Sequence, residues 1–193
     1  ELLEIYIPHS GISAARNKGI EVSDAEWITF CDFDDCYADV YSLCMLMQGL
    51  NNNQFDLMWN KFYMTRNIDI DIPPDIRKEL DWVWMANKYY RLDFLKERGI
   101  KFNEELAYAE DSAFNNWVRF EIGEGKVGEI VTPGPLYAWC RRRGSTTTAD
   151  ENQIRNIQHV LKRNIYVSQM YVDYGRQAAP LMMARTITDG YSI

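Results

Sequence analysis

Long apolar runs are missing from this sequence. Over its 193 residues, none approaches the roughly 20 consecutive apolar residues that a membrane-spanning helix needs. The first four residues, Glu-Leu-Leu-Glu, also lack the basic start of a secretion signal. The sequence therefore predicts a cytosolic protein, and it leaves peripheral contact with a membrane open as an alternative.

Basic residues are outnumbered in the chain. There are 21 Lys and Arg residues against 28 Asp and Glu residues, which gives a formal net charge of -7. Because phosphate backbones are strongly negative, such a balance disfavours contact with nucleic acid unless the basic residues cluster tightly. We therefore expect no nucleic-acid partner.

Paired cysteine motifs are also absent. The four cysteines, Cys31, Cys36, Cys44 and Cys140, include no C-x-x-C spacing of the kind that zinc sites use. Cys31 lies in an apolar run, and a free cysteine behaves as a small hydrophobic residue. We expect free thiols that are buried and inert, without a disulfide framework.

The residues that are present indicate a single α/β domain. With 47% hydrophobic residues the chain can bury a core, and it has no internal repeat and no linker rich in Gly, Ser or Pro. Strands are expected at residues 2–7, 27–31, 56–60, 127–131 and 136–139. Helices are expected at residues 40–50, 92–98, 110–122 and 151–171, with a further short helix capped by Ser13. Because strands alternate with helices, we expect parallel pairing in the sheet.

Two features complete the predicted organisation. Residues 69–75 contain Pro73 and Pro74 and should form a surface loop. Gly99 should end the helix that precedes it. The last helix is expected to bury a stripe that consists of Ile154, Ile157, Val160, Leu161, Ile165 and Val167.

Three aspartates follow the apolar strand at residues 27–31. Asp32, Asp34 and Asp35 stand at the carboxyl edge of the expected sheet, where open α/β folds collect ligands. Alternation along an extended chain would point Asp32 and Asp34 to the same side. Two such carboxylates suit Mg²⁺ or Mn²⁺ that carries a substrate diphosphate. A solvated turn that caps the next helix is the alternative, and the tetrapeptide alone leaves both interpretations open.

Short motifs follow one another in the order found in a known family. Residues 11–20 (GISAARNKGI) resemble the S-A-A-R-N-x-G helix of the family two glycosyltransferases, and residues 32–35 resemble their D-x-D-D turn. Residues 87–91 are similar to the family's N-K-L-Y-R stretch, and residues 110–114 to its E-D-x-x-F motif. Residues 136–145 resemble its L-Y-x-W/Y-R-x-R-x-G-S element. The resemblance implies the GT-A fold, a Rossmann-like mixed sheet flanked by helices.

The resemblance also implies an activity. It predicts an inverting glycosyltransferase that moves a sugar from a nucleoside-diphosphate sugar to an acceptor hydroxyl with a divalent metal, Mn²⁺ or Mg²⁺. Asp34 would be the principal metal ligand, and Asp32 would face the ribose or the water shell of the metal. Asp111 would be the catalytic base, and Glu110 would orient it or meet the acceptor. From the residues alone, Glu110 and Asp111 are better explained as ordinary first-turn acids of an amphipathic helix.

Basic side chains are the expected partners of the diphosphate. By the resemblance, Arg16 would reach the nucleotide or diphosphate, and a salt-bridged arginine is the alternative. Arg142 or Arg143 would hold the diphosphate through the two-pronged geometry of guanidinium, with a solvated charge run as the alternative. The chain departs from the family at this element, because the usual first arginine falls at Cys140.

The resemblance further implies a missing beginning. Family members open with a strand, a helix and a second strand before the S-A-A-R-N helix, and this chain has only a few residues there. We expect a fragment or a shortened homologue, in which residues 1–149 form a partial GT-A core and residues 150–193 a helical segment packed on it. The open sheet edge would be covered by a second copy or a partner chain.

Other functions stay open at this stage. A non-catalytic binding or structural protein on a truncated GT-A scaffold is the runner-up, because a fold does not imply a function. A glycoside hydrolase with paired acids would need neither the metal nor the arginine cluster. The acceptor would be a glycan, a lipid or a protein. Three tryptophans could stack on sugar or base, with core burial expected for at least two of them: Trp82, Trp84 and Trp139.

Overall fold

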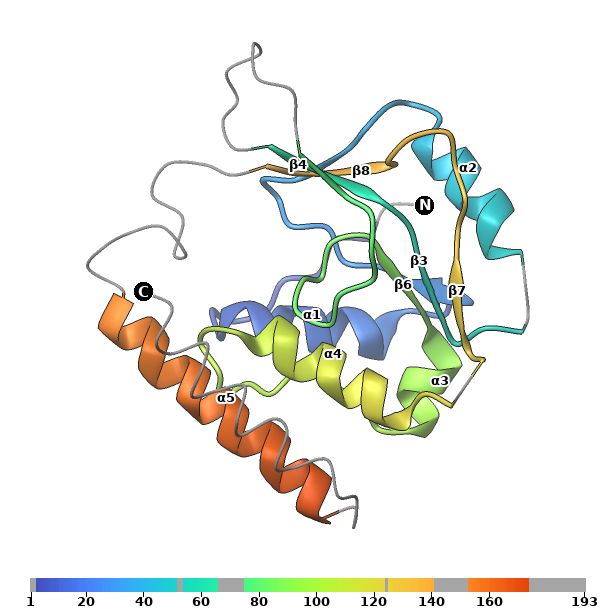
Figure 1. The fold of residues 1–193 in the computed structure, drawn as a ribbon. Coiled ribbons are helices and arrows are strands. Elements are labelled where there is room, and N and C mark those ends of the chain that lie inside the picture. Colours follow the sequence, from blue (N-terminus) through green and yellow to red (C-terminus); the bar gives the residue numbers. More distant parts are fainter. Residues whose placement is uncertain (1–2, 52–53, 66–74, 124, 141–152, 174–193) are drawn as a thin grey trace.

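The structure is a computed structural model that describes residues 3–51, 54–65, 75–123, 125–140 and 153–173 (Figure 1). Within these residues the strands form two four-stranded sheets, with helices around them. The first sheet has the order β1 (Trp27–Ile28), β6 (Lys88–Arg91), β3 (Leu57–Trp59) and β7 (Val127–Glu129). The second has the order β2 (Cys36–Tyr37), β8 (Tyr137–Cys140), β4 (Phe62–Thr65) and β5 (Asp75–Arg77). The helices are α1 (Gly11–Val22), α2 (Ser42–Leu50), α3 (Leu92–Glu97), α4 (Glu110–Glu121) and α5 (Gln153–Asp173).

Most strand pairs are antiparallel, so the expected parallel pairing is wrong for them. Strand β6 runs antiparallel to both of its neighbours, β1 and β3, whereas the pairs β3 with β7 and β4 with β8 are parallel. The connections explain the difference, since parallel neighbours need a long crossover that is usually helical. Between β3 and β6 the chain instead builds β4 and β5 of the second sheet and then returns in the opposite direction.

Several predicted elements are confirmed, most of them with shorter bounds. Helices α2, α3 and α4 and strands β3, β7 and β8 lie where the sequence places them. Gly99 follows α3 with a φ of +63°, the left-handed conformation that favours glycine at a helix end. The strand expected at residues 27–31 is paired only at its first two residues. Of the loop expected at residues 69–75, residues 69–74 lie outside the described residues, and Asp75 begins β5.

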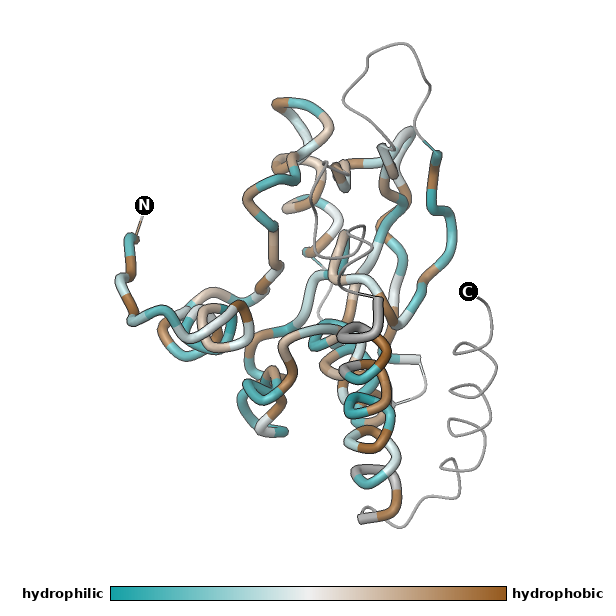
Figure 2. The backbone as a smooth tube through the Cα atoms, turned by 90° about the vertical axis from the view of Figure 1, so that its left-hand side faces the viewer, coloured by the Kyte–Doolittle hydropathy of each residue, from teal (hydrophilic) through white to brown (hydrophobic). Residues whose placement is uncertain are grey.

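The segment before α1 does not form the predicted strand. Residues 3–10 have no regular structure and run exposed at the margin of the molecule (Figure 2). A strand needs a paired neighbour to satisfy its backbone groups, and none of the described strands pairs with this segment. Helix α1 then begins at Gly11, and Ser13 is buried inside the helix, so the predicted N-cap is also wrong.

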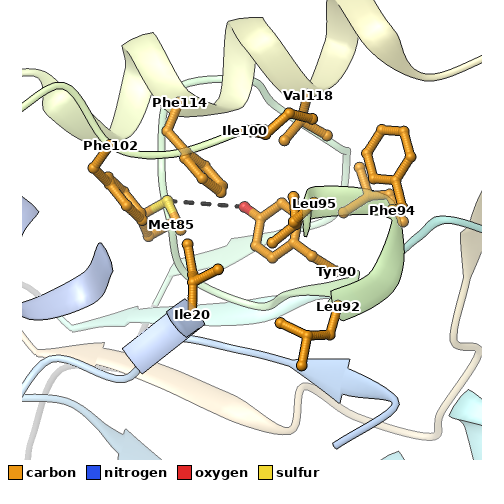
Figure 3. Packing of buried hydrophobic residues seen from close by; sticks show 11 residues of the cluster. Ile20, Met85, Tyr90, Leu92, Phe94, Leu95, Ile100, Phe102, Phe114 and Val118 are labelled. Carbon is orange, nitrogen blue, oxygen red and sulfur yellow. Dashed lines mark hydrogen bonds between the residues drawn. The ribbon is translucent and has the colours of Figure 1, made fainter. Parts of the chain in front are cut away.

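The main core holds the start of α4 against β6. Figure 3 shows Tyr90 of β6 beneath α4, close to Phe114 of that helix. Tyr90 is fully buried, and its hydroxyl donates a hydrogen bond to Oδ1 of Asn115 at 2.7 Å. The rings of Phe102 and Phe114 stack with centroids 4.1 Å apart. Full burial of each such side chain contributes about 1.5–3 kcal/mol to the free energy of folding, and this burial holds α4 against β6.

Helix α5 packs along α4 (Figure 1), but half of the residues in its predicted buried stripe are exposed. Val167 is fully buried with Ala113 and Phe120 of α4, as expected. Three other members of the predicted stripe are exposed, namely Ile157, Leu161 and Ile165. Apolar periodicity predicts a helix, but contacts such as the hydrogen bond from Arg163 to Oγ of Ser112 decide which face meets its neighbour. Across the described ranges, no helix is both long and apolar enough to cross a membrane.

Candidate active site

A cavity of about 910 Å³ lies beyond the end of β1. Its walls come from segments that are far apart in the sequence: α1, residues 28–35, residues 83–86, residues 107–112 and β8. The described parts of the sequence motifs therefore meet at one place, namely the S-A-A-R-N helix, the acidic turn, the start of α4 and the end of β8. This cavity is the candidate active site.

The acidic segment after β1 is a tight turn and not an extended strand. The backbone N of Asp35 donates to the carbonyl O of Asp32 at 2.9 Å, which closes the turn. The expected alternation of Asp32 and Asp34 along an extended chain is therefore wrong, although both residues still line the cavity. Phe33 lies between them and is 85% exposed.

Arg16 joins the two acidic motifs. Its Nη2 lies 2.8 Å from Oδ1 of Asp32, and its Nη1 lies 3.0 Å from Oε1 of Glu110. The arginine side chain is only 8% exposed, so this double ion pair closes one wall of the cavity. In this structure the salt-bridged alternative for Arg16 is the one observed. The same contacts place the acidic turn and the start of α4 next to each other.

The carboxyl of Asp111 has a raised pKa. Burial, and then the negative charge of Glu110, raise the pKa of its carboxyl to about 7. The backbone N of Ser112 donates to Oδ1 of Asp111 at 2.6 Å, and Arg16 and Lys88 are nearby cations, which together limit the rise in pKa. A carboxylate that titrates near neutral pH is well matched to accept a proton from a substrate.

Lys88 is a site neighbour that the sequence analysis missed. It is 2% exposed, and its Nζ donates to the carbonyl O of Trp84 and lies 3.7 Å from Oδ1 of Asp81. Burial lowers its pKa, while Asp81 and Asp111 oppose that change. The N-K-L-Y-R stretch contains this lysine, but only the fold reveals that its charge acts on Asp111.

Asp35 anchors the acidic turn to β8, a role that the sequence analysis also missed. The hydroxyl of Tyr137 donates to its Oδ2 at 2.6 Å, and the backbone N of Cys140 donates to its Oδ1 at 2.9 Å. Burial raises the pKa of Asp35, and both hydrogen bonds oppose the rise. These bonds tie the acidic turn to β8 across more than 100 residues of sequence.

Replacing Tyr137 by Phe is expected to loosen this tie. The variant removes one hydrogen bond to a partly buried carboxylate, which contributes about 1.5–3 kcal/mol, so the free energy of unfolding should fall by about that amount. Urea unfolding followed by circular dichroism measures the change. Tyr41→Phe is the matched control, because Tyr41 is 69% exposed and its variant should stay within about 0.5 kcal/mol of the wild type. Equal stability of both variants would remove the structural role assigned to Tyr137.

Two of the three singled-out tryptophans line the cavity. Trp84 and Trp139 are half-buried and meet edge to face, with ring centroids 4.9 Å apart and an angle of 72° between the rings. Each also packs against the cluster around Phe62 and Tyr137. Trp82 packs against the main core instead.

The cysteines are free, as expected, but they are not buried. Cys31, Cys36 and Cys44 are exposed, and Cys140 is half-buried. The prediction failed for Cys31 because β1 ends at Ile28, which leaves the rest of the apolar run outside the sheet. Arg142 and Arg143, predicted to hold the diphosphate, lie outside the described residues.

The acids of the turn fit a metal that substrate helps to hold. Among the described residues no group of three or more His, Cys, Asp or Glu side chains could hold a metal ion by itself. Mg²⁺ and similar ions are commonly bound by one or two carboxylates together with substrate phosphates. Asp32 and Asp34, both at the cavity, are carboxylates of the number and type that such binding uses.

A family comparison identifies the class to which this fold and site belong. The family model described as "Glycosyl transferase family 2" matches residues 5–111, which include α1, the acidic turn and the start of α4. The chain belongs to this family, and the resemblance inferred from the motifs is confirmed.

Individual relatives agree with this assignment. The chain is 27% identical over 130 residues to the uncharacterized glycosyltransferase EpsJ of Bacillus subtilis (strain 168), a match that covers 58% of this chain and 38% of EpsJ. The crystal structure of S. aureus TarS has a TM-score of 0.62 at 16% identity and covers 95% of this chain and 32% of TarS. TarS 1-349 in complex with UDP-GlcNAc has a TM-score of 0.59 at 17% identity and covers 81% of this chain and 47% of the other. The structural neighbours confirm the expected GT-A fold, and the chain spans less than half the length of these relatives.

Proposed function

We propose that this chain carries the metal-binding and acceptor-side part of an inverting glycosyltransferase. The observation that carries the proposal is the Arg16 bridge, which places the acidic turn and the Glu110–Asp111 pair at one cavity. A transfer reaction needs the acidic turn and the Glu110–Asp111 pair within reach of a donor and an acceptor bound at the same time. The ion pairs provide that arrangement, although 94 residues separate Arg16 from Glu110 in the sequence.

The donor would be a nucleoside-diphosphate sugar. Crystal structures of TarS 1-349 contain UDP-GlcNAc or UDP, which makes a uridine nucleotide the first donor to test on this chain. Asp34 would be the principal ligand of Mn²⁺ or Mg²⁺, and Asp32 would contact the ribose or the water shell of the metal. When bound, the metal neutralises the charge that develops on the departing diphosphate.

Asp111 would accept the proton of the acceptor hydroxyl. Its pKa of about 7 leaves a substantial fraction of the carboxyl ionised at neutral pH, so it can act as a base without further activation. Attack of that hydroxyl on the anomeric carbon, opposite the leaving diphosphate, inverts the configuration in one displacement. Glu110, held by Arg16, would keep the first turn of α4 oriented beside the acceptor.

The alternative function is a binding or structural protein that retains the scaffold without transfer. Raised carboxyl pKa values cluster at catalytic sites, but buried ion-pair networks of structural proteins raise them too. Nucleotide binding therefore separates the two functions experimentally.

A thermal-shift measurement with UDP and Mn²⁺ tests the proposal. At 100 times its Kd, a ligand that binds only the folded state stabilises it by about 2.7 kcal/mol, which corresponds to a rise in Tm of roughly 5–10 °C for a domain of this size. Asp34→Ala should abolish the rise. Asp24→Ala, a change at an exposed aspartate outside the cavity lining, should keep it. A wild-type chain that shows no shift with uridine, guanosine, adenosine or thymidine diphosphate and either metal would favour the binding-protein alternative.

A further inference from the structure

Trp84 and Trp139 occupy a particular place in the cavity. They meet edge to face at 4.9 Å, and both are half-buried. In such an arrangement one ring presents its edge to the face of the other, so the pair forms a corner that leaves further ring surface to other contacts. Because both residues line the cavity, this corner is available to a bound molecule.

The corner is built rigidly. The carbonyl O of Trp84 accepts hydrogen bonds from Nζ of Lys88 and from Nδ2 of Asn115 at 3.0 Å. Both donors are buried, at 2% and 0% exposure. Oδ1 of Asp81 accepts hydrogen bonds from the backbone N of Val83 and of Trp84, each at 2.8 Å. These bonds fix the backbone of Trp84.

The two tryptophans are attached to opposite halves of the site. Asn115, which holds Trp84, lies one helical turn after Asp111 on α4. Trp139 precedes Cys140, whose backbone N holds Asp35 of the acidic turn. The backbone on either side of the corner is therefore tied both to the helix that carries the proposed base and to the turn that carries the proposed metal ligands.

We propose that Trp84 and Trp139 form the acceptor subsite and that the acceptor is a carbohydrate, an inference that rests on the proposed transferase function. A pyranose ring presents a face of C–H groups, with its hydroxyls around the rim. The negative face of an indole attracts those positively polarised C–H groups, and the apolar contact excludes water. Asn115 ties the backbone of Trp84 to α4, the helix that carries Asp111, so a sugar seated on Trp84 would occupy the cavity that Asp111 also lines. A flexible lipid or serine hydroxyl has no ring face to use such a corner.

Saturation-transfer NMR on the full chain, without donor or metal, tests this subsite directly. The probes are methyl β-glucopyranoside, methyl β-galactopyranoside and methyl N-acetyl-β-glucosaminide, with glycerol 3-phosphate and N-acetylserinamide as hydroxyl compounds that lack a sugar ring. We expect saturation of ring protons for at least one glycoside and none for the two other compounds. An aromatic contact contributes about 0.5–1.5 kcal/mol, so Trp84→Ala and Trp139→Ala should each raise the glycoside Kd by roughly 2- to 12-fold.

Matched variants separate recognition from folding. Trp84→Phe keeps an aromatic face and should lose less affinity than Trp84→Ala. Trp82→Phe changes a tryptophan of the same segment that packs on the core and does not line the cavity, so it should leave the glycoside Kd unchanged. Far-ultraviolet circular dichroism checks that every variant is folded.

Three results would overturn the subsite. The first is a folded wild type that binds none of the glycosides, and the second is glycoside binding that neither alanine variant weakens. The third is that the alanine variants lose UDP binding but keep glycoside binding, which would assign the corner to the nucleotide base. The Tm rise with UDP and Mn²⁺ is measured in parallel. Glycoside binding at Trp84 without that rise would reject the proposed donor function and leave the sugar subsite standing, whereas the converse would reject only the subsite.

Discussion

Asp111→Asn is expected to lower the rate of sugar transfer by about 10²- to 10⁴-fold, the usual contribution of general base catalysis. The amide keeps the shape of the carboxyl but cannot accept the proton of the acceptor hydroxyl. Binding of UDP with Mn²⁺ should persist, because the proposed metal ligands lie on the acidic turn and not on α4. Release of UDP from the sugar donor in the presence of acceptor measures the rate, and the Tm rise with UDP measures the binding.

The pH dependence gives this prediction a second readout. Since the pKa of Asp111 is raised to about 7, the wild-type rate should increase as pH rises through about 7, when the carboxyl loses its proton. The same raised pKa makes ionisation unfavourable in the folded state. The stability of the wild type relative to Asp111→Asn should therefore fall as pH rises from about 4 to 7 and level off above it. Full activity in Asp111→Asn, or an unchanged pH profile, would reject Asp111 as the base.

Arg16→Met is expected to lower the free energy of unfolding by about 2–3 kcal/mol. Removing one partner of a buried ion pair typically costs about 3–5 kcal/mol, and we expect less here because the Asp32 side chain is 41% exposed. Most of the loss should come from Glu110, which is 12% exposed and would keep its charge without the arginine. Urea unfolding at pH 7 and low salt measures the change.

Two further variants check the origin of that loss. Arg16→Met combined with Glu110→Gln should be more stable than Arg16→Met alone, because the second change removes the uncompensated carboxylate. Lys18→Met on the same helix removes an exposed pair, Lys18 with Glu21 at 2.9 Å, and should cost no more than about 1 kcal/mol. Equal losses for Arg16→Met and Lys18→Met would show that the bridge does not hold the site together.

Local patterns predicted the elements whose stability depends on their own residues. The apolar spacing of residues 110–122 and the two acids in the first turn predicted α4 correctly. Gly99 marked the end of α3 for an equally local reason, its tolerance of a positive φ. Residues 3–7 show the limit of this reasoning, because an apolar run becomes a strand only when another strand pairs with it.

The candidate site likewise contains residues that local motifs predicted and residues whose role depends on contacts with distant segments. The motifs identified four acidic residues as candidate site residues, namely Asp32, Asp34, Glu110 and Asp111. The family comparison supports the motifs as a set. The roles of Lys88 and Tyr137 were not visible, because each acts through a contact with a distant segment. The buried face of α5 was misjudged for a related reason, since its partner helix selects one of several apolar stripes.

By itself, then, the sequence determined the family, most of the helices and the acidic side chains available to the candidate site. Only the tertiary structure decided that Arg16 meets both Asp32 and Glu110, that Asp111 is buried enough to titrate near neutrality, and that two tryptophans form a corner tied to both the acidic turn and α4. The physical reason is that charge interaction and burial depend on distance in space, and segments separated by many residues acquire that proximity only when the chain folds.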